Sequence, residues 1–479
     1  MKYDQYDLII TGTGFASTFF LKKYLEKNKG KKKILVLERG QFFPHAERLK
    51  IKRGEISNFK GIQEHWEDTV VNKNQEKKWP FTTGFGGSSS CWWGCTPRFM
   101  PSDFQMNTLF GIEKDWPVSY TDLEPYYEET EKLMSVSGPD ETPFPRNGKY
   151  PLPPHRFTAV DHLMHQTYGN QYISQPTARA SRAVNGRNAC MANSTCDVCP
   201  VNAKFTIENS GMDVYADQQV EIIYGAQVFS LETRGNLAKK VNYVKDGKDY
   251  EIAGEIIVLG ANPIFNSNIL LNSGDNNPLT GKGFGEQLGM QVLIYLDQMK
   301  NIGGSTWVNA NGYMLYDGVH RKDFAACLIE TNNAPYYIRL ERGKWLNMAS
   351  FRMIFEDLPM ESNYITNSPD KLVPVINFNG RSDYTRRGIE NMKNKLPGLL
   401  SCLPVEKLKY LDPFPNEGHI LGGTRMGHDA KDSVVDKHLI HHQYRNVFVL
   451  GSGAFTTFSA SNPTLTLAAL SLYTADHSF

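Results

Sequence analysis

The chain has 479 residues, enough for two or three domains and a large buried core. With 40% hydrophobic and 22% charged residues, its composition is that of a folded protein rather than a disordered one. The 52 basic side chains balance the 51 acidic ones, so binding to nucleic acid or to an acidic membrane surface is not expected. No stretch reaches the roughly 20 apolar residues of a membrane span, and the N-terminus runs directly into a strand-like segment, so we expect neither a membrane span nor an export signal.

The N-terminal segment predicts a strand–helix–strand unit of a parallel sheet. An apolar run over residues 6–11 is followed by a glycine turn and by apolar residues at helical spacing over 15–24. A second apolar run covers residues 34–37. This order of elements indicates an α/β fold with a parallel sheet.

The glycine turn has the residues of a dinucleotide-binding site. Gly12 permits a tight bend, and Gly14 lets the backbone approach a pyrophosphate at the N-terminus of the helix. Glu38 ends the second strand, where such folds place the acceptor for a ribose hydroxyl. Ser17 stands where a third glycine is usual, so a βα turn without a ligand is the alternative.

Residues 82–94, with the sequence TTGFGGSSSCWWG, are too rich in glycine and serine for a regular element. Small residues would let backbone amides reach a phosphate or a ring, and the tryptophans would form a wall of the site. The alternative is a surface loop that its tryptophans anchor to the core. Other elements are expected as strands over 220–229, 255–259 and 447–450, helices over 122–134, 265–271 and 465–473, and an antiparallel sheet over 290–411.

Several separated motifs form a recognisable set. In chain order they are Gly12-x-Gly14 with Glu38 and Arg39, Gly86-Gly87-Ser88-Ser89, Trp116-Pro117, Val258 to Ala261, and the tail from His419 to Asn462-Pro463-Thr464. The most specific parts are GHILGGTRMG over 418–427, SVVD over 433–436 and NPTLT over 462–466. Over nearly the whole chain this set resembles the glucose–methanol–choline (GMC) oxidoreductases.

The resemblance implies an FAD-binding Rossmann-like domain and an α+β substrate domain built on an antiparallel sheet. The FAD domain would be discontinuous, with residues 1–100, 183–290 and 415–479. Residues 101–182 and 291–414 would form the substrate domain and insertions.

The resemblance also implies oxidation of an alcohol CH–OH group by hydride transfer to flavin N5. The family's active-site pair of a histidine with a second histidine or an asparagine falls here on His419 and Asn462. A near-neutral imidazole can accept the hydroxyl proton while the amide orients the oxygen. The alternative is a buried histidine and an asparagine that caps the last helix.

Cofactor contacts carry over residue by residue. Many relatives have an Asp near Gly451, and we expect Ser452 or backbone to replace it. Some relatives link a histidine covalently to the flavin at the position of Cys91, so a histidyl link is not expected here and a cysteinyl one is a minor alternative. The implied FAD contacts are Gly12, Gly14, Phe15, Ala16, Glu38, Arg39, Gly86, Gly87, Ser88, Ser89, Cys91, Val228, Ala261, Ser452, Ala454, Pro463 and Thr464.

The chain has seven cysteines, and three of them, Cys190, Cys196 and Cys199, are close together and precede a proline. This segment resembles that of bacterial FAD-dependent sugar dehydrogenases, a branch that carries a three-iron four-sulfur (3Fe–4S) cluster, although the spacing differs. Three thiolates suit iron–sulfur ligation. Ordinary buried thiols and a zinc site are the alternatives, and zinc normally needs a fourth ligand.

The branch resemblance favours a sugar, polyol or glycoside as the substrate, and Trp307, Tyr336 and Tyr337 could stack on a sugar ring or lie in the core. The alternatives are a sterol, a long-chain alcohol or a natural-product intermediate as substrate, or a non-catalytic flavin-binding electron-transfer protein. The implied partners are an electron acceptor, which would be a cytochrome, quinone or oxygen, and a small subunit for export. The location would be cytoplasmic, or periplasmic by co-export with that subunit.

Overall fold

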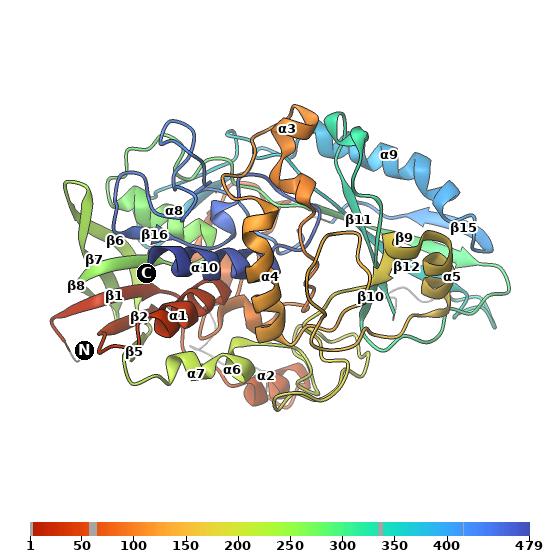
Figure 1. Ribbon diagram of the computed structural model, residues 1–479, viewed down its shortest axis with the longest axis horizontal. Helices are drawn as coiled ribbons and strands as arrows, with labels where there is room; N and C mark the ends of the chain where they lie inside the picture. The colour runs from red at the N-terminus through yellow and green to blue at the C-terminus, as the bar shows by residue number, and fades with distance from the viewer. Residues whose placement is uncertain (1–2, 57–64, 334–338, 415) are drawn as a thin grey trace.

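The protein is described here by a computed structural model that covers residues 3–56, 65–333, 339–414 and 416–479. Two large sheets lie toward opposite ends of an elongated molecule, with α4 (Tyr120–Met134) between them in the view of Figure 1. The fold is α/β with a second, antiparallel sheet, as the sequence predicts.

The first sheet has seven strands and contains the N-terminal unit. Strands β5, β2, β1, β8 and β16 are parallel, and β6 and β7 extend the sheet beside β8 in antiparallel fashion. The strand β2 is buried along its whole length, which explains its continuous apolar run. The strands are β1 (Gln5–Thr11), β2 (Ile34–Glu38), β5 (Val220–Tyr224), β6 (Gln227–Arg234), β7 (Leu237–Lys245), β8 (Lys248–Leu259) and β16 (Val447–Val449).

Helices cover this sheet. The helix α1 (Phe15–Lys27) lies against the C-terminal helix α10 (Thr464–Ser478), which also contacts α4. The helix α8 (Pro263–Asn272) packs against β6. Side chains of α1, α4 and α10 therefore share one apolar core with the strands.

The second sheet has six strands in the order β15-β9-β12-β11-β10-β4, and all its pairs are antiparallel. Alternate residues such as Phe351 and Met353 pack under α5 and α9. The opposite face presents Glu330 and Arg352, which are cross-strand partners. The elements are β4 (Tyr172–Ser174), β9 (Leu288–Leu296), β10 (Val308–Leu315), β11 (Cys327–Asn332), β12 (Met348–Phe355), β15 (Val405–Tyr410), α5 (Ala159–Tyr168) and α9 (Asp383–Leu399).

Smaller elements complete the described part of the chain. A three-stranded sheet has the order β13-β14-β3. In residues 3–56, 65–333, 339–414 and 416–479, no helix combines the length and the apolar run that a membrane crossing needs. The remaining strands and α-helices are β3 (Val71–Asn72), β13 (Tyr364–Thr366), β14 (Val375–Asn377), α2 (His45–Lys52), α3 (Met106–Phe110), α6 (Ile207–Ser210) and α7 (Met212–Tyr215).

Two local predictions differ from the structure. The run over 220–229 forms two strands, because Gly225 adopts a positive φ of 70° between them. The region 290–411 contains the helix α9 as well as strands. Its buried residues Ile389, Met392 and Leu396 have helical spacing, and Ser382 caps its N-terminus.

A buried ion-pair network joins α4 to the segment that precedes it. The guanidinium of Arg98 donates to both carboxylate oxygens of Glu131, at 2.7 and 3.0 Å, and to Glu124 at 3.1 Å. The side chains of Arg98 and Glu131 are 0% and 1% exposed. Arg146 also donates to Glu131 at 3.0 Å, so loss of Arg98 would leave Glu131 with one cation in place of two and would remove the cation that pairs with Glu124.

We expect Arg98→Met to lower the free energy of unfolding by about 3–5 kcal/mol, because Glu131 and Glu124 lose their main cation. Lys149→Met is the control, since Lys149 and Asp140 form a surface pair that is 86% and 80% exposed and contributes little. Thermal unfolding of the two variants measures the difference. Equal midpoints would show that the network does not stabilise the fold.

Candidate active site

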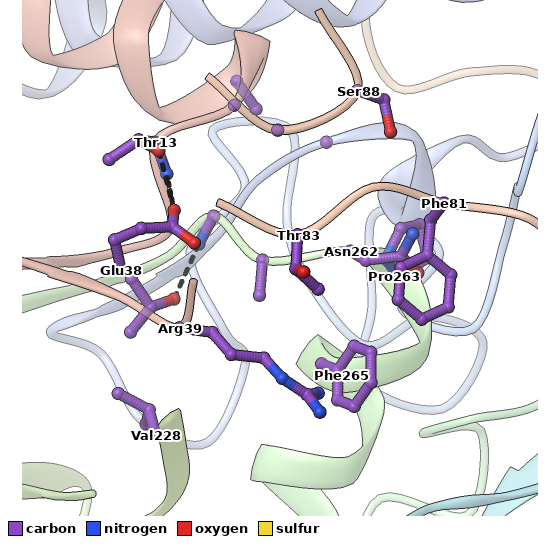
Figure 2. Close-up of a pocket in the computed structure, with 18 of the residues that line it drawn as sticks. Thr13, Glu38, Arg39, Phe81, Thr83, Ser88, Val228, Asn262, Pro263 and Phe265 are labelled. Atoms are coloured by element: carbon purple, nitrogen blue, oxygen red, sulfur yellow. Dashed lines mark hydrogen bonds between the residues drawn. The ribbon is translucent and has the colours of Figure 1, made fainter. Parts of the chain in front are cut away.

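A nucleotide-sized groove lies where the parallel strands end. This first cavity, of about 220 Å³, is lined from β1, α1, β2, the loop over 81–88, β6 and α8. Figure 2 shows Thr13 and Glu38 hydrogen-bonded on one side of the cavity, Arg39, Phe265 and Val228 below them, and Ser88 at the upper right. The guanidinium of Arg39 lies 4.8 Å from the centre of the Phe265 ring.

The start of α1 is open toward this cavity. Gly14 is the N-cap residue of α1, no side chain caps the helix, and no acidic residue lies in its first turn. The first amides of a helix need acceptors, and a phosphate is one that fits. A Cβ on Gly14 would meet no protein atom within 4 Å, and Thr83 Oγ1, also in the lining, is buried without a partner. These features fit a dinucleotide such as FAD.

Ser17 replaces the usual third glycine without loss of packing. Its hydroxyl donates to the carbonyl oxygens of Thr11 and Gly260, at 3.2 and 3.3 Å. A Cβ on Gly260 would lie only 2.0 Å from this hydroxyl. Close contact between α1 and the sheet therefore depends on Gly260, which directly follows β8.

Glu38 lines the cavity, but protein donors already occupy its carboxylate. One oxygen accepts from the Thr13 amide and hydroxyl at 3.0 and 2.7 Å, and the other accepts from the amides of Gly40 and Gly84 at 2.9 and 3.3 Å. Burial raises the pKa of Glu38, and these donors oppose that effect. Glu38 thus ties three loops together, and its role as a ribose acceptor stays a prediction.

A second cavity, of about 480 Å³, adjoins the first and contains the predicted pair His419 and Asn462. The two cavities share lining residues from α1, the 81–88 loop and the segment after β16, among them Phe15, Ser88 and Ser452. A cofactor that extends along the first cavity would therefore reach the second.

Burial lowers the pKa of His419 to about 4, with Glu286 opposing and Arg352 reinforcing the effect. The imidazole is therefore neutral near pH 7 and able to accept a proton. The amide N–H groups of Glu417 and His419 both donate to a Glu286 oxygen at 2.8 Å, which anchors the main chain around the histidine.

The second cavity also has a polar wall, formed by Glu330, Arg352 and Glu417. Arg352 pairs with Glu417, and the cross-strand neighbour Glu330 accepts from Gln175 Nε2 at 2.9 Å. Asn462 is hydrogen-bonded to Glu330, yet Asn462 Oδ1, Glu417 Oε1 and Arg352 Nε are buried without a partner. These atoms could bind a ligand that carries several hydroxyl groups.

Most of the predicted cofactor contacts lie in the cavities. Gly86, Ser89 and Ala454 lie outside both linings: the Gly86 amide donates to Thr13 Oγ1, Ser89 Oγ accepts from the Ile207 amide, and Ala454 is fully buried. The first cavity contains Gly12, Gly14, Phe15, Ala16, Glu38, Arg39, Gly87, Ser88, Val228, Ala261 and Ser452, and the second contains Cys91, Pro463 and Thr464 in addition.

Sequence reasoning missed the polar wall. Glu330, Arg352 and Glu417 belong to no motif of the resemblance, and Gln287, which contacts His419, likewise carries no signature. The position of Glu417 directly before Gly418-His419 is the only sequence signal that could have suggested it.

The three clustered cysteines do not form a ligand set. Cys190 Sγ lies 3.5 Å from Thr306 Oγ1, Cys199 Sγ accepts from the Ala203 amide, and Cys196 packs beside Cys95. Among the residues that the structure describes, which include all three, no group of three or more His, Cys, Asp or Glu side chains could hold a metal ion. The structure therefore does not support the predicted 3Fe–4S cluster.

Trp307, one of the three predicted sugar-stacking aromatics, is not at the cavity. Trp307 is 1% exposed and packs edge-on against Trp93, with 6.0 Å between the ring centres. Trp93, rather than Trp307, lines the second cavity. Tyr336 and Tyr337 lie outside the described residues.

The fold and the cavities thus fit a dinucleotide-binding protein with a second cavity beside the nucleotide groove, and comparisons with known proteins agree. Residues 401–471 match a family model described as GMC oxidoreductase. The fructose dehydrogenase large subunit of Gluconobacter japonicus is 27% identical and covers 82% of this chain and 80% of its own. The 2-methyl-1,2-propanediol dehydrogenase of Mycolicibacterium austroafricanum is 25% identical and covers 99% and 95%.

A solved structure has the same fold. An FAD-dependent oxidoreductase from Chaetomium thermophilum is 12% identical and matches 98% of both chains with a TM-score of 0.70. The C-terminal part of the chain thus matches the GMC oxidoreductases, the similar proteins are named as dehydrogenases, and FAD is the cofactor that the first cavity fits.

We expect Gly14→Ala to fold normally but to raise the Kd for FAD roughly tenfold or more, about 1.4 kcal/mol, because the new methyl group occupies the space beside the helix amides. Gly30→Ala is the matched control: a Cβ there also meets no protein atom, and Gly30 is an exposed residue far from the cavity. Titration of the apoproteins with FAD measures both constants. Equal constants would mean that Gly14 does not face the cofactor.

The raised pKa of Glu417 predicts that its contribution to the free energy of unfolding depends on pH. Burial raises its pKa from the ordinary 4.5 to about 7, although Arg352 opposes the shift. Because the folded pKa exceeds the unfolded one, the unfolded state loses its proton first as the pH rises from 4.5 to 7, and this group's contribution to stability falls over that window.

Thermal unfolding at a series of pH values tests this expectation. Glu417→Gln should become more stable relative to the natural protein as the pH rises through the window, because glutamine does not ionise. Glu406→Gln is the control, since ion pairing with Arg339 lowers the pKa of Glu406 and places its titration below the window. A constant difference for Glu417→Gln would refute the raised pKa.

Proposed function

We propose that this protein oxidises a CH–OH group of a sugar, polyol or glycoside to a carbonyl, with FAD as the hydride acceptor. The observation that carries the proposal is the placement of His419 and Asn462 in one chamber that adjoins the nucleotide cavity and has a charged, hydrogen-bonding wall. Bound FAD supplies the acceptor for the hydride at its N5 atom.

The chain's own residues bind the alcohol and remove its proton. His419, neutral at pH 7, accepts the hydroxyl proton. Asn462 is hydrogen-bonded to Glu330, and its second amide hydrogen is available to the reacting oxygen. Removal of the proton raises the electron density on the carbon and favours departure of its hydride.

The polar wall supports a substrate with several hydroxyl groups. Arg352, Glu330 and Glu417 offer both donors and acceptors, and such groups pair well with neighbouring hydroxyls. A sterol or a long-chain alcohol would leave these buried groups unsatisfied, at a cost of about 1–3 kcal/mol each. The relatives named for fructose and for a propanediol are consistent with a polyol.

The acceptor that reoxidises the flavin would be a cytochrome, a quinone or oxygen. One relative is named as a large subunit, which is consistent with a partner subunit here. A small partner could also carry this chain to the periplasm, and without one the enzyme would act in the cytoplasm.

We further propose that each of the two domains is built around one of the two large sheets, with the domain boundaries given in the sequence analysis.

Anaerobic reduction of the bound flavin tests the proposal. Sugars and polyols should bleach the flavin band, whereas a sterol and a long-chain alcohol should not. His419→Ala should slow the reduction roughly 10²–10⁴-fold, the range that a general base contributes. His428→Ala is the control, since His428 is an exposed histidine of the same C-terminal tail.

Each other outcome selects an alternative. Reduction by the sterol or the long-chain alcohol alone would replace the polyol with an apolar substrate. Reduction by none of the alcohols, with FAD bound, would favour a non-catalytic flavoprotein. Full activity of His419→Ala would remove His419 from the mechanism.

A further inference from the structure

The side-chain amide of Gln287 contacts His419 and the loop that leads into Asn462, the two predicted catalytic residues. Gln287 directly precedes β9, which lies between β15 and β12 in the second sheet. Its Oε1 lies 2.5 Å from Nδ1 of His419. Its Nε2 donates to the carbonyl oxygens of Ser459 and Ser461, the latter at 2.7 Å, in the loop that leads directly into Asn462.

The two serine carbonyls determine which way this amide points. Carbonyl oxygens accept hydrogen bonds and cannot donate them, so the NH₂ group of Gln287 must face the loop. Its Oε1 must therefore face His419, and because Oε1 only accepts, Nδ1 of His419 must carry the proton. A neutral imidazole has one N–H, so Nε2 has the free lone pair.

We propose that Gln287 is a positioning residue that holds His419 in the Nδ1–H tautomer, with Nε2 as the basic atom, and that ties the histidine to the loop bearing Asn462. This inference rests on the proposed function. Gln287 is 0% exposed and does not line the chamber, so it acts through His419 rather than on the substrate.

The surroundings of Gln287 are rigid enough for this role. Ser459 Oγ donates to Asp103, and the hydroxyl of Tyr316 contacts both serine side chains and Asp103. Arg321 in turn donates to Asp103 at 2.8 Å. The loop carbonyls that orient Gln287 are therefore held by a buried network of their own.

Two substitutions of Gln287 separate tautomer control from simple packing. Gln287→Met has a similar size but no acceptor for the Nδ1 proton. Gln287→Glu keeps an acceptor oxygen in either protonation state. We expect the rate of anaerobic flavin reduction to fall roughly 10²-fold in Gln287→Met, the lower end of a general base's contribution, and to stay within about tenfold of the natural protein in Gln287→Glu.

Gln291→Met is the matched control, because Gln291 is a buried glutamine of β9, four residues after Gln287, and its amide donates to Ser350 rather than to the site. FAD content and thermal midpoint serve as folding checks for each variant. Equal losses in Gln287→Met and Gln287→Glu would mean that Gln287 only packs, and an unimpaired Gln287→Met would overturn the proposal as well.

A second readout does not depend on turnover. In protein labelled with ¹⁵N-histidine, His419→Ala identifies the His419 signals by their loss. The natural protein and Gln287→Glu should show the Nδ1–H tautomer, and Gln287→Met should show the Nε2–H form or a mixture. An Nε2–H form in the natural protein would overturn the inference, whereas full activity of His419→Ala would instead overturn the proposed function.

Discussion

The site depends on a close backbone approach where β1 and β8 end side by side. Gly12 has a φ of 79°, and a Cβ there would lie 3.0 Å from the carbonyl oxygen of Gly260. Because neither position leaves room for a side chain, α1 can begin directly at the strand ends, with its first amides open to the groove. β16 pairs with β8 at the same edge, and the chain after it carries Ser452 and Asn462 to the two cavities. One crowded junction therefore places both the cofactor groove and part of the chamber.

The second sheet contributes chemistry through the face that α5 and α9 do not cover. One face packs under α5 and α9, and alternation along β11 and β12 turns Glu330 and Arg352 the other way. Buried ion pairs contribute little net stability, because desolvation offsets much of their attraction. Their presence in the chamber is better explained by recognition: a polar ligand can satisfy the atoms that the protein leaves without partners.

Local signals predicted the strands and the glycine turn, because these features depend on contiguous residues, and the family resemblance pointed to the tail that holds His419 and Asn462. The contact of Gln287 with His419 joins residues 132 positions apart, and no local pattern encodes it. The cysteines show a limit of spacing arguments: their ligand-like spacing suggested a cluster, yet the described residues contain no group of three or more side chains that could hold a metal ion. The helix α9 was missed because its apolar residues were interpreted as part of an alternating sheet pattern, although their spacing is helical.

The proposed mechanism requires the chamber to combine a neutral base with charged groups that bind the substrate. Glu286 raises the pKa of His419 and Arg352 lowers it, and burial exceeds both effects, so the imidazole stays neutral beside several charges. A carboxylate at Nδ1 would orient the ring equally well, but it would also stabilise the imidazolium. An amide at that place orients the ring without adding a charge. The choice of glutamine at position 287 is therefore consistent with a base that is oriented by a hydrogen bond and kept neutral by its surroundings.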